Sequence, residues 1–394
     1  MLVELHIIQN FASSNLNRDE SGAPKDCEFG GYRRARISSQ CIKRAIRGCF
    51  RDERLLDEEH LAKRTKRLLD QLAGQLVGRG RDPDLVHNVV MAALKGMRFG
   101  FDKEGKTEYL LFLGAAEIDA LAKACDEHWN ALVDSVEAGS TARAKAGERQ
   151  SARGVKQAGQ QAIPDEVRGA LEKVLDGGKA ADLALFGRML ADRPEKNVDA
   201  ACQVAHAVST NRVSVEFDFY TAVDDLKPDD TAGADMLGTV EFNSACYYRY
   251  ANVDLEQLKQ NLGGDEDLTR RTLEAFVRAS IDAVPTGKQN SMAAQNPPSF
   301  VLAVARERRL WSLANAFVQP VRPDGNGDLV QNSVRALDAY WGQLARMYGE
   351  NGIVGKWCAM LDGDGLTHLA RYQVDGVEAV IAGLLAAVKF ESED

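Results

Sequence analysis

The spacing of apolar residues changes twice along this chain, and this limits the possible fold more than any other feature. Residues 2–9, LVELHIIQ, form an apolar run that predicts a buried strand. From about residue 55 to 190 the apolar residues recur at three- and four-residue spacing, as in amphipathic helices. After residue 199, VSVEFDF alternates between apolar and polar positions, which is typical of a strand. The chain is therefore predicted to be α+β, with a sheet interrupted by a helical insertion.

Weaker signals place the remaining elements. Residues 11–36 have the composition of a long polar loop, and Ser38 and Ser39 can cap the helix that follows. Later segments predict a strand and helix in VEFNSACYYRYANVDLEQLKQNLGG, a helix in TLEAFVRASIDAV, a strand in SFVLAVARE, and two more helices near the C-terminus. This order is compatible with a ferredoxin-like or RRM-type core, whose sheet commonly binds RNA.

Composition narrows the class of protein. The length of 394 residues suits one large domain with an insertion, or two to three lobes. Seven cysteines without a C-x-x-C pair indicate reduced thiols, and we expect a soluble, cytoplasmic protein. The N-terminus lacks a signal peptide, and no stretch approaches the ~18 to 20 apolar residues of a membrane span, so no membrane partner is expected.

The strongest local feature is the segment GGYRRARISSQCIKRAIRGCFR, which ends at Arg51 and contains seven basic residues and no acidic one. The net charge of the chain is -9, which taken alone disfavours nucleic acid as a partner, so this local asymmetry needs a cause. Arg44, Arg47 and Arg51 are predicted to share a helix face opposite Ile42 and Ile46. Together with the helix N-terminus and the glycine pair, they predict a cradle for a phosphate backbone. A solvated basic face is the alternative.

Two further segments are less specific. A second basic run could contact nucleic acid or simply solubilise a loop, and its residues are Arg143, Lys145, Arg149, Arg153 and Lys156. The segment PTGKQNSMAAQNP, between a predicted helix and strand, could be a loop that contacts a nucleic-acid backbone.

Evidence for catalysis is weak. The six histidines show no metal-ligand spacing, and His206, in the apolar stretch AHAVST, is predicted to be a packed residue. The acidic pairs Asp224–Asp225 and Asp229–Asp230 flank Pro228 and are expected in solvated turns. We therefore expect no catalytic residue, no metal and no cofactor.

Several of these blocks resemble one known family. LNRD, GGYRRARISSQCIKRAIR, AHAVSTNRVSVEFDFYTAVDDL, LGTVEFNSACYYRYANVDLEQLKQNLGG, VPTGKQNSMAAQNP and WSLANAFVQPV occur in the same order as blocks of the CasC family, the crRNA-binding backbone subunits of type I-E CRISPR Cascade complexes. The resemblance implies an RRM-like palm at residues 1–54, 191–197 and 240–394, a helical finger insertion at 55–190, and a β-hairpin thumb at 198–239.

The resemblance also implies a function. Copies of such a subunit stack head to tail along one crRNA, together with other Cascade subunits, and leave guide bases free to pair with target DNA. The thumb of one copy displaces a base of its neighbour's RNA at regular intervals. This role in antiviral defence requires no enzymatic activity.

The RNA contacts follow from the same resemblance. In the palm they would be Asn17, Arg18, Arg34, Arg36, Ser38, Ser39, Gln40, Lys43, Arg44 and Arg47, and in the glycine-containing loop Lys288, Gln289 and Asn290. Met189, in a GRM stretch, would wedge against the displaced base, and the thumb would contribute Phe219, Tyr220, Thr221 and Val223.

Two other classes remain as alternatives. An endoribonuclease of the same superfamily would need a general base such as histidine near a palm loop, and the basic segment contains none; a thumb aspartate, Asp224 or Asp225, could serve instead. A DNA-binding regulator would need a helix-turn-helix, and the basic segment predicts no such motif.

Overall fold

The computed structural model describes residues 1–394 except 147–162, 191–192, 223–235, 326, 364 and 389–394. The chain divides into two compact units, each of which is considered by itself. The sheet unit comprises Met1–Leu55, Cys202–Glu256 and Arg270–Asp394. The helical unit comprises Leu56–Ala201 and Gln257–Thr269.

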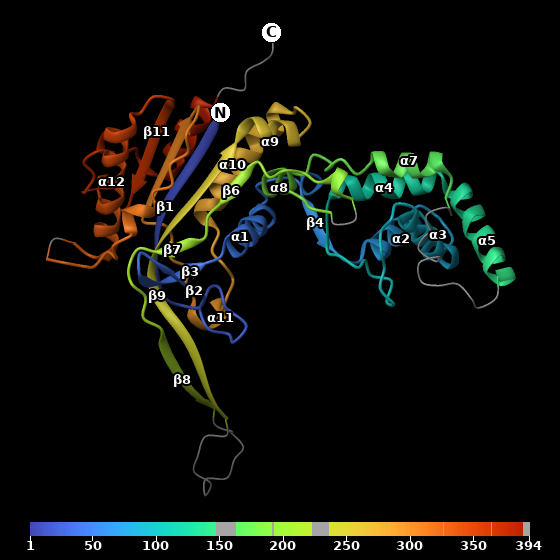
Figure 1. Ribbon diagram of the computed structural model, residues 1–394, viewed down its shortest axis with the longest axis horizontal. Helices are drawn as coiled ribbons and strands as arrows, with labels where there is room; N and C mark the ends of the chain where they lie inside the picture. Colours follow the sequence, from blue (N-terminus) through green and yellow to red (C-terminus); the bar gives the residue numbers. More distant parts are fainter. Residues whose placement is uncertain (147–162, 191–192, 223–235, 326, 364, 389–394) are drawn as a thin grey trace, which may run out of the picture. The chain divides into compact units, whose positions relative to one another are not determined.

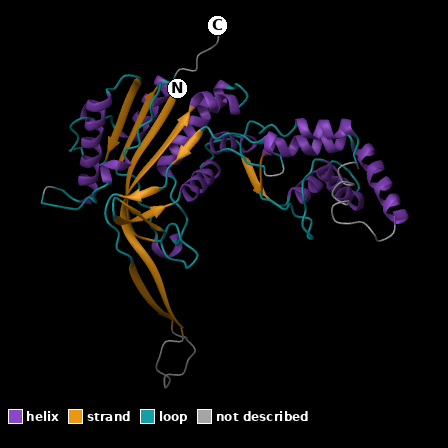
Figure 2. Ribbon diagram, in the orientation of Figure 1, coloured by secondary structure: helices purple, strands orange, loops and turns teal. Residues whose placement is uncertain are grey.

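An antiparallel sheet forms the centre of the sheet unit (Figures 1 and 2). Among the described residues its strand order is β11-β10-β1-β9-β7-β3-β2, and β6 and β8 also pair with β9. The strands are β1 (Leu2–Ser14), β2 (Asp26–Phe29), β3 (Tyr32–Ile37), β6 (Cys202–Val204), β7 (Ala207–Ser209), β8 (Glu216–Ala222), β9 (Met236–Asp254), β10 (Phe300–Arg306) and β11 (Ile353–Met360).

The core of this unit has ferredoxin-like connectivity. In chain order it runs β1, α1 (Ser39–Asp52), β6, β9, α10 (Glu266–Asp282) and β10, and the sheet order of its strands is β10-β1-β9-β6. All three pairings are antiparallel. This is the split βαβ arrangement that RRM domains share, so the predicted α+β class with an RRM-like core is confirmed.

Helices cover both faces of the sheet. Leu5 and Ile7 of β1 line a small cavity with Ile42 and Ile46 of α1, so α1 covers this face. Ile8 has the opposite orientation because successive side chains of a strand alternate, and it belongs to the core of α12 (Leu329–Tyr348). A third helix, α13 (Gly376–Ala387), packs on β10 and β11. Burial on both faces explains why nearly every position of the first strand is buried, including the polar Glu4 and His6.

The strands β8 and β9 form a hairpin that extends beyond the sheet (Figure 1). Residues 236–242 of β9 pair with β8, from Glu216↔Phe242 to Ala222↔Met236, whereas β9 from Asn243 onward pairs with β1. The Asn15 amide donates to the Glu241 and Gly22 carbonyls, both at 2.9 Å, and so ties the base of the hairpin to the segment after β1.

The helical unit has its own apolar core. Leu72 and Leu76 of α2 pack there with Val90 of α3 and Leu121 of α4. Its helices are α2 (Leu68–Gly78), α3 (Pro83–Gly96), α4 (Ala115–Glu127), α5 (Trp129–Ala146), α7 (Asp165–Lys173) and α8 (Ala181–Phe186), and β4 (Ala62–Thr65) pairs with β5 (Leu111–Gly114). The other helices among the described residues are α9 (Leu255–Asn261), α11 (Gln289–Met292) and the 3₁₀ turns Glu58–His60, Pro194–Lys196, Ala314–Phe317 and Ala370–Tyr372.

The structure corrects the prediction of a polar loop over residues 11–36. The first strand continues to Ser14, and β2 and β3 form a hairpin within the expected loop. The glycine pair is the two-residue turn of this hairpin, with φ of 63° at Gly30 and 79° at Gly31. Turns that match the strand twist need positive φ at both positions, so the pair serves the hairpin rather than an approaching ligand.

Two other segments also differ from, or complete, the sequence prediction. The segment TEYLLFLG contains the strand β5, and the C-terminal third contains β11 in addition to its two predicted helices.

Within the described part of the chain, no helix combines the length and apolar character that a membrane span requires.

Candidate nucleic-acid interface

The face of the sheet that RRM domains commonly offer to RNA is occupied here. In such a fold both helices pack on one face, and the other face is free to bind. In this chain α12 covers that other face, where Trp341 is 1% exposed and packs in one core with Ile8 and Leu302. RNA bound by the sheet unit must therefore contact other surfaces, such as the loops, the end of α1, the β2–β3 edge or the projecting β8–β9 hairpin.

The N-terminus of α1 is built to meet an anion. Ser38 caps the helix, with its hydroxyl accepting from the Cys41 backbone N–H at 3.3 Å. The first turn contains no acidic residue, and the first carboxylate of the helix is Asp52 at its end. Free backbone N–H groups and the helix dipole both favour negative charge at this end.

Two loops join α1 at this end. The Asn17 side chain accepts from the Ser38 backbone N–H at 2.8 Å, which fixes the segment after β1 against the cap. Gly287 touches the same segment, because a Cβ there would lie 2.3 Å from the Leu16 carbonyl oxygen. The structure thus brings together the LNRD segment, the start of α1 and the glycine-containing loop, which are far apart in sequence.

Within the glycine-containing loop the predicted residues have different surroundings. The Gln289 amide donates to the Pro285 and Ala294 carbonyls, both at 3.0 Å, so this side chain stabilises the loop itself. Lys288 has a left-handed backbone with φ 53° and is half-buried, whereas Asn290 is exposed. Of the three predicted contacts, Lys288 and Asn290 are the better placed to meet a ligand.

A group of basic side chains surrounds the start of α1, and we call it the α1 basic surface. Arg18 and Arg44 are exposed, as is the polar Gln40, and Arg36, Ser39 and Lys43 are half-buried. Lys25 also belongs here, although the sequence did not single it out. Burial raises the pKa of the Cys41 thiol, and the charges of the nearby Arg44 and Lys25 oppose that rise. The surface thus comprises Arg18, Lys25, Arg36, Lys43 and Arg44.

Two predicted arginines have structural surroundings instead. Arg34 is 0% exposed. Its guanidinium donates to the carbonyls of Ser209 at 2.9 Å, Thr210 at 2.8 Å, Phe317 at 2.7 Å and Val318 at 3.2 Å. Arg47 is 9% exposed and lies among the buried residues of α1, so it does not share an exposed face with Arg44 and Arg51 as expected. Neither guanidinium is open to a phosphate in this conformation.

The structure corrects the predicted burial of His206. Predicted to be packed, it is exposed and lies at the α1 basic surface. Its Nδ1 accepts from the Ser39 backbone N–H at 3.2 Å and lies 3.3 Å from the Arg36 guanidinium. Burial, aided by the positive charges of Arg36 and Lys25, lowers the pKa of His206. An accepting Nδ1 leaves the proton of the neutral ring on Nε2, as a donor.

The projecting hairpin carries exposed aromatic side chains. Phe217 and Phe219 are 67% and 65% exposed and, two residues apart, lie on the same face of β8 as the exposed Thr221. The Tyr220 ring lies on the other face over Gly238, where a Cβ would be 2.3 Å from the ring carbon that carries the hydroxyl. Val223 lies outside the described residues, and Phe217 is an aromatic candidate that the prediction omitted.

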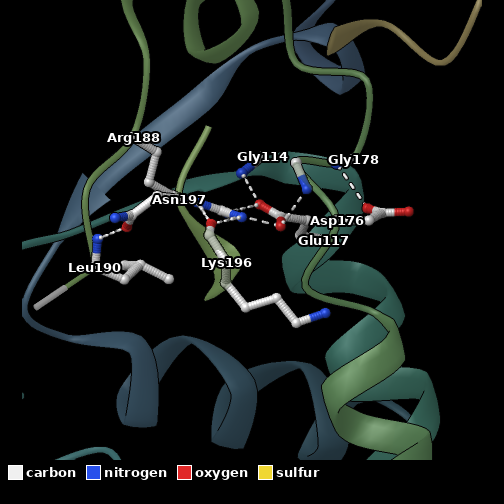
Figure 3. Close-up of polar contacts among 9 residues, drawn as sticks. Gly114, Glu117, Asp176, Gly178, Arg188, Leu190, Lys196 and Asn197 are labelled. Carbon is white, nitrogen blue, oxygen red and sulfur yellow. Dashed lines mark hydrogen bonds and ion pairs between the residues drawn. The ribbon is translucent and has the colours of Figure 1, made fainter. Parts of the chain in front are cut away.

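In the helical unit, Met189 is the most conspicuous predicted residue. It is 83% exposed, although Arg188 and Leu190 on either side are 5% and 4% exposed. Around it, Arg188, Glu117 and Asn197 form a network of polar contacts (Figure 3).

The other predicted groups lie wholly or partly outside the described residues. Arg149, Arg153 and Lys156 of the second basic run lie outside the described residues, as do the side chains of Arg143 and Lys145. The same holds for Asp224, Asp225, Asp229 and Asp230.

In the described part, Asp57, Glu59 and His60 place three possible metal-ligand atoms within 4.8 Å of one another. They are largely exposed, and His60 already pairs with Glu59 at 3.6 Å.

Comparison with known proteins identifies the class of this α+β protein. The model of the CT1975-like protein family matches residues 3–386, so the chain belongs to that family. No curated protein matches it.

Two solved structures are similar over nearly the whole chain. One is a chain of a "CRISPR RNA-guided surveillance complex, pre-nicking", with 31% sequence identity, a TM-score of 0.83, and coverage of 98% of this chain and 100% of that one. The other is a chain of a "CRISPR RNA-guided surveillance complex", with 26% identity, a TM-score of 0.72 and the same coverage. By family and fold the protein thus belongs with subunits of CRISPR surveillance complexes.

Proposed function

We propose that this protein is the crRNA-binding backbone subunit of a type I-E Cascade complex, of the CasC kind. In this proposal the sheet unit is the palm, the β8–β9 hairpin is its thumb and the helical unit is the finger. Copies polymerise head to tail along crRNA in the cytoplasm, assemble with other Cascade subunits and present guide bases to target DNA. The similarity to surveillance-complex chains supports the complex, and the α1 basic surface supports the RNA contact.

The single observation that carries the RNA contact is the convergence at the start of α1. Three segments meet there, basic side chains surround a helix N-terminus whose first turn has no acidic residue, and the sheet face used by other RRM domains is covered. Such a surface contacts phosphates and does not read bases, which suits a subunit that must hold any guide sequence.

The structure places one histidine, His206, at the α1 basic surface, but its contacts do not suit the general base of a nuclease. A general base needs a free lone pair, whereas in the protein without RNA the Nδ1 of His206 accepts a backbone N–H and faces a guanidinium. We therefore keep the proposal that the protein is not an enzyme. Intact RNA after prolonged incubation with purified protein is the expected result, and discrete cleavage products would overturn this part.

RNA content of the purified protein is the first test. Protein from cells with a CRISPR array should show a high ratio of absorbance at 260 to 280 nm and carry RNA of crRNA length, and protein from cells without an array should not. A clean protein ratio from both kinds of cell would contradict the proposed function.

Charge reversal locates the contact. The double variant Arg18→Glu, Arg44→Glu should bind single-stranded RNA more weakly, and its slope of log affinity against log salt should fall by about 0.7 for each lost phosphate contact. The matched control is Arg308→Glu, Arg346→Glu, which changes the net charge equally at exposed sites elsewhere on the sheet unit. Equal losses in both double variants would show a nonspecific charge effect and exclude the α1 basic surface as the site.

A further inference from the structure

Arg249 of β9 is a buried cation that has no carboxylate partner among the described residues. It is 7% exposed, and burial lowers the pKa of its guanidinium to about 10, so the group stays charged at neutral pH. Its Nη2 donates to the Ser280 carbonyl at 2.7 Å, and its Nη1 donates to the side-chain oxygen of Gln9 at 2.6 Å. Burial of a charge is costly unless the charge is paired, so two neutral acceptors need an explanation.

A second buried arginine of the sheet unit is paired differently. Arg306 is 1% exposed, and its Nε lies 2.8 Å from a carboxylate oxygen of the buried Glu4. A glutamate at position 9 would neutralise Arg249 in the same way. The chain has glutamine there, which accepts from a guanidinium as a carboxylate does but can also donate.

The Gln9 side chain uses both ends of its amide. Its Oε1 accepts from Arg249, and its Nε2 donates to the Asn296 carbonyl at 2.7 Å. Gln9 lies in β1, whereas Asn296 lies in the glycine-containing loop. Because only the amide oxygen can accept from a guanidinium, Arg249 turns the donating end toward the loop. We call these two side chains with their hydrogen bonds the Arg249–Gln9 pair.

The glycine-containing loop has a strained backbone that must be held in place. Lys288 and Ala293, on either side of α11, have positive φ angles of 53° and 47° although neither is glycine. Such conformations cost free energy and persist where the surrounding structure fixes them. Ala294 is buried, and the Gln289 amide bonds to its carbonyl at 3.0 Å, which closes the loop on itself. Gln9 then bonds the end of the closed loop to β1.

We infer that Arg249 and Gln9 are positioning residues that hold the glycine-containing loop in the conformation in which Lys288 contacts a phosphate of the bound RNA. This inference rests on the proposed function, because it assumes that the chain binds RNA at this loop. Neither side chain touches the RNA, since both are buried. The buried charge orients the amide, and the amide holds the loop, which accounts for an arginine that is paired with a glutamine and not with a carboxylate.

The competing explanation is that the Arg249–Gln9 pair only stabilises the sheet unit. Gln9→Glu separates the two explanations. The new carboxylate would pair with Arg249 and keep the melting temperature, but it has no N–H for the Asn296 carbonyl and would repel that oxygen. A stabilising role therefore predicts normal RNA binding by Gln9→Glu, whereas a positioning role predicts the loss of a contact.

The test measures the affinity of the full-length protein for single-stranded RNA at several salt concentrations. Lys288→Ala should reduce the slope of log affinity against log salt by about 0.7, the value for one phosphate contact. Gln9→Glu should reduce the slope equally at an unchanged melting temperature. Combining the two changes should cause no further reduction, because both remove the same contact, whereas independent effects would add.

Two more variants keep the test interpretable. Arg306→Met is the matched control, because it removes the other buried guanidinium, which lies beside Leu2 at the far end of β1 from Gln9. It should lower the melting temperature and keep the slope. If Gln9→Glu does not fold, Gln9→Met with Arg249→Met gives the same test, since it replaces the whole polar pair by apolar groups.

The outcomes distinguish the inference from the proposed function. A normal slope in Gln9→Glu with a reduced slope in Lys288→Ala, or additive losses in the combined variant, would overturn the positioning role and leave the Lys288 contact in place. A normal slope in Lys288→Ala would overturn the inference entirely, because the loop would then make no phosphate contact through this residue. Absence of RNA binding by the unaltered protein would overturn the proposed function with it.

Discussion

His206 occupies the donors that an RNA phosphate would use. Its neutral ring accepts from the Ser39 backbone N–H and lies beside the Arg36 guanidinium. A phosphate oxygen would satisfy the same two donors, with a full negative charge. The exchange would leave the ring free to take up a proton, which its positive neighbours otherwise oppose.

This geometry predicts a pH dependence of RNA binding. In the free protein, burial and the charges of Arg36 and Lys25 hold the pKa of His206 below 6.5, and a bound phosphate should raise it. Binding then takes up a proton, so affinity should rise as pH falls through that range, by about tenfold for each unit of pKa change. His206→Asn should flatten the dependence measured between about pH 8 and 5.5. Equal slopes in both proteins would exclude His206 from the interface.

The residues themselves show why part of this site is invisible in sequence. The basic segment and the glycine-containing loop stand out by composition and the LNRD segment by its resemblance to a family block, and the structure brings them together. The surroundings of His206 and Arg34 were predicted wrongly, because they depend on partners far along the chain: His206 meets Ser39, and Arg34 meets Thr210 and Phe317. No local pattern separates a phosphate-binding arginine from one that holds carbonyls.

At the scale of elements, long and strongly periodic segments were predictable and short ones were not. The strand β1 and the helices α1 and α10 follow from apolar spacing. The strands β2 and β3 lie in a polar stretch, and their evidence is mainly the pairing between them. In β11, Gly355 and the buried Lys356 interrupt the apolar pattern; Gly355 leaves room for the Trp357 ring, which a Cβ would approach to 2.2 Å.

The hairpin gives a prediction at this scale. Phe217→Ser together with Phe219→Ser should leave the melting temperature nearly unchanged, because both rings are exposed, and should weaken RNA-dependent association. Stacking of a base on an aromatic ring contributes about 1 to 3 kcal/mol, so the effect should be readily measured by titration. Met347→Ser with Leu361→Ser is the matched control, since these side chains are 75% and 76% exposed elsewhere on the sheet unit. Similar losses in both pairs would argue against a specific role for the hairpin.

At the scale of the whole molecule, the proposed function requires an acidic protein to bind a polyanion. The formal net charge is -9, yet residues 30–51 have no acidic side chain and contribute Arg36, Lys43 and Arg44 to the α1 basic surface. The acidic excess is therefore carried by the rest of the chain. Stacked copies could place a basic surface of one copy against an acidic surface of the next, and such contacts are screened by salt.

This distribution predicts that assembly depends on both RNA length and salt. With RNA of increasing length at low salt, the particle mass should grow in steps of one 43.1 kDa subunit plus RNA, because each copy covers a fixed length of backbone. Raising salt from about 0.05 to 0.5 M should disperse the particles, since both phosphate contacts and charged contacts between copies weaken. Mass photometry or light scattering measures both effects. One subunit per RNA at every length would contradict stacking, and particles that persist unchanged at high salt would show that apolar contacts, with the Phe217–Phe219 face as the first candidate, hold the copies together instead of charge.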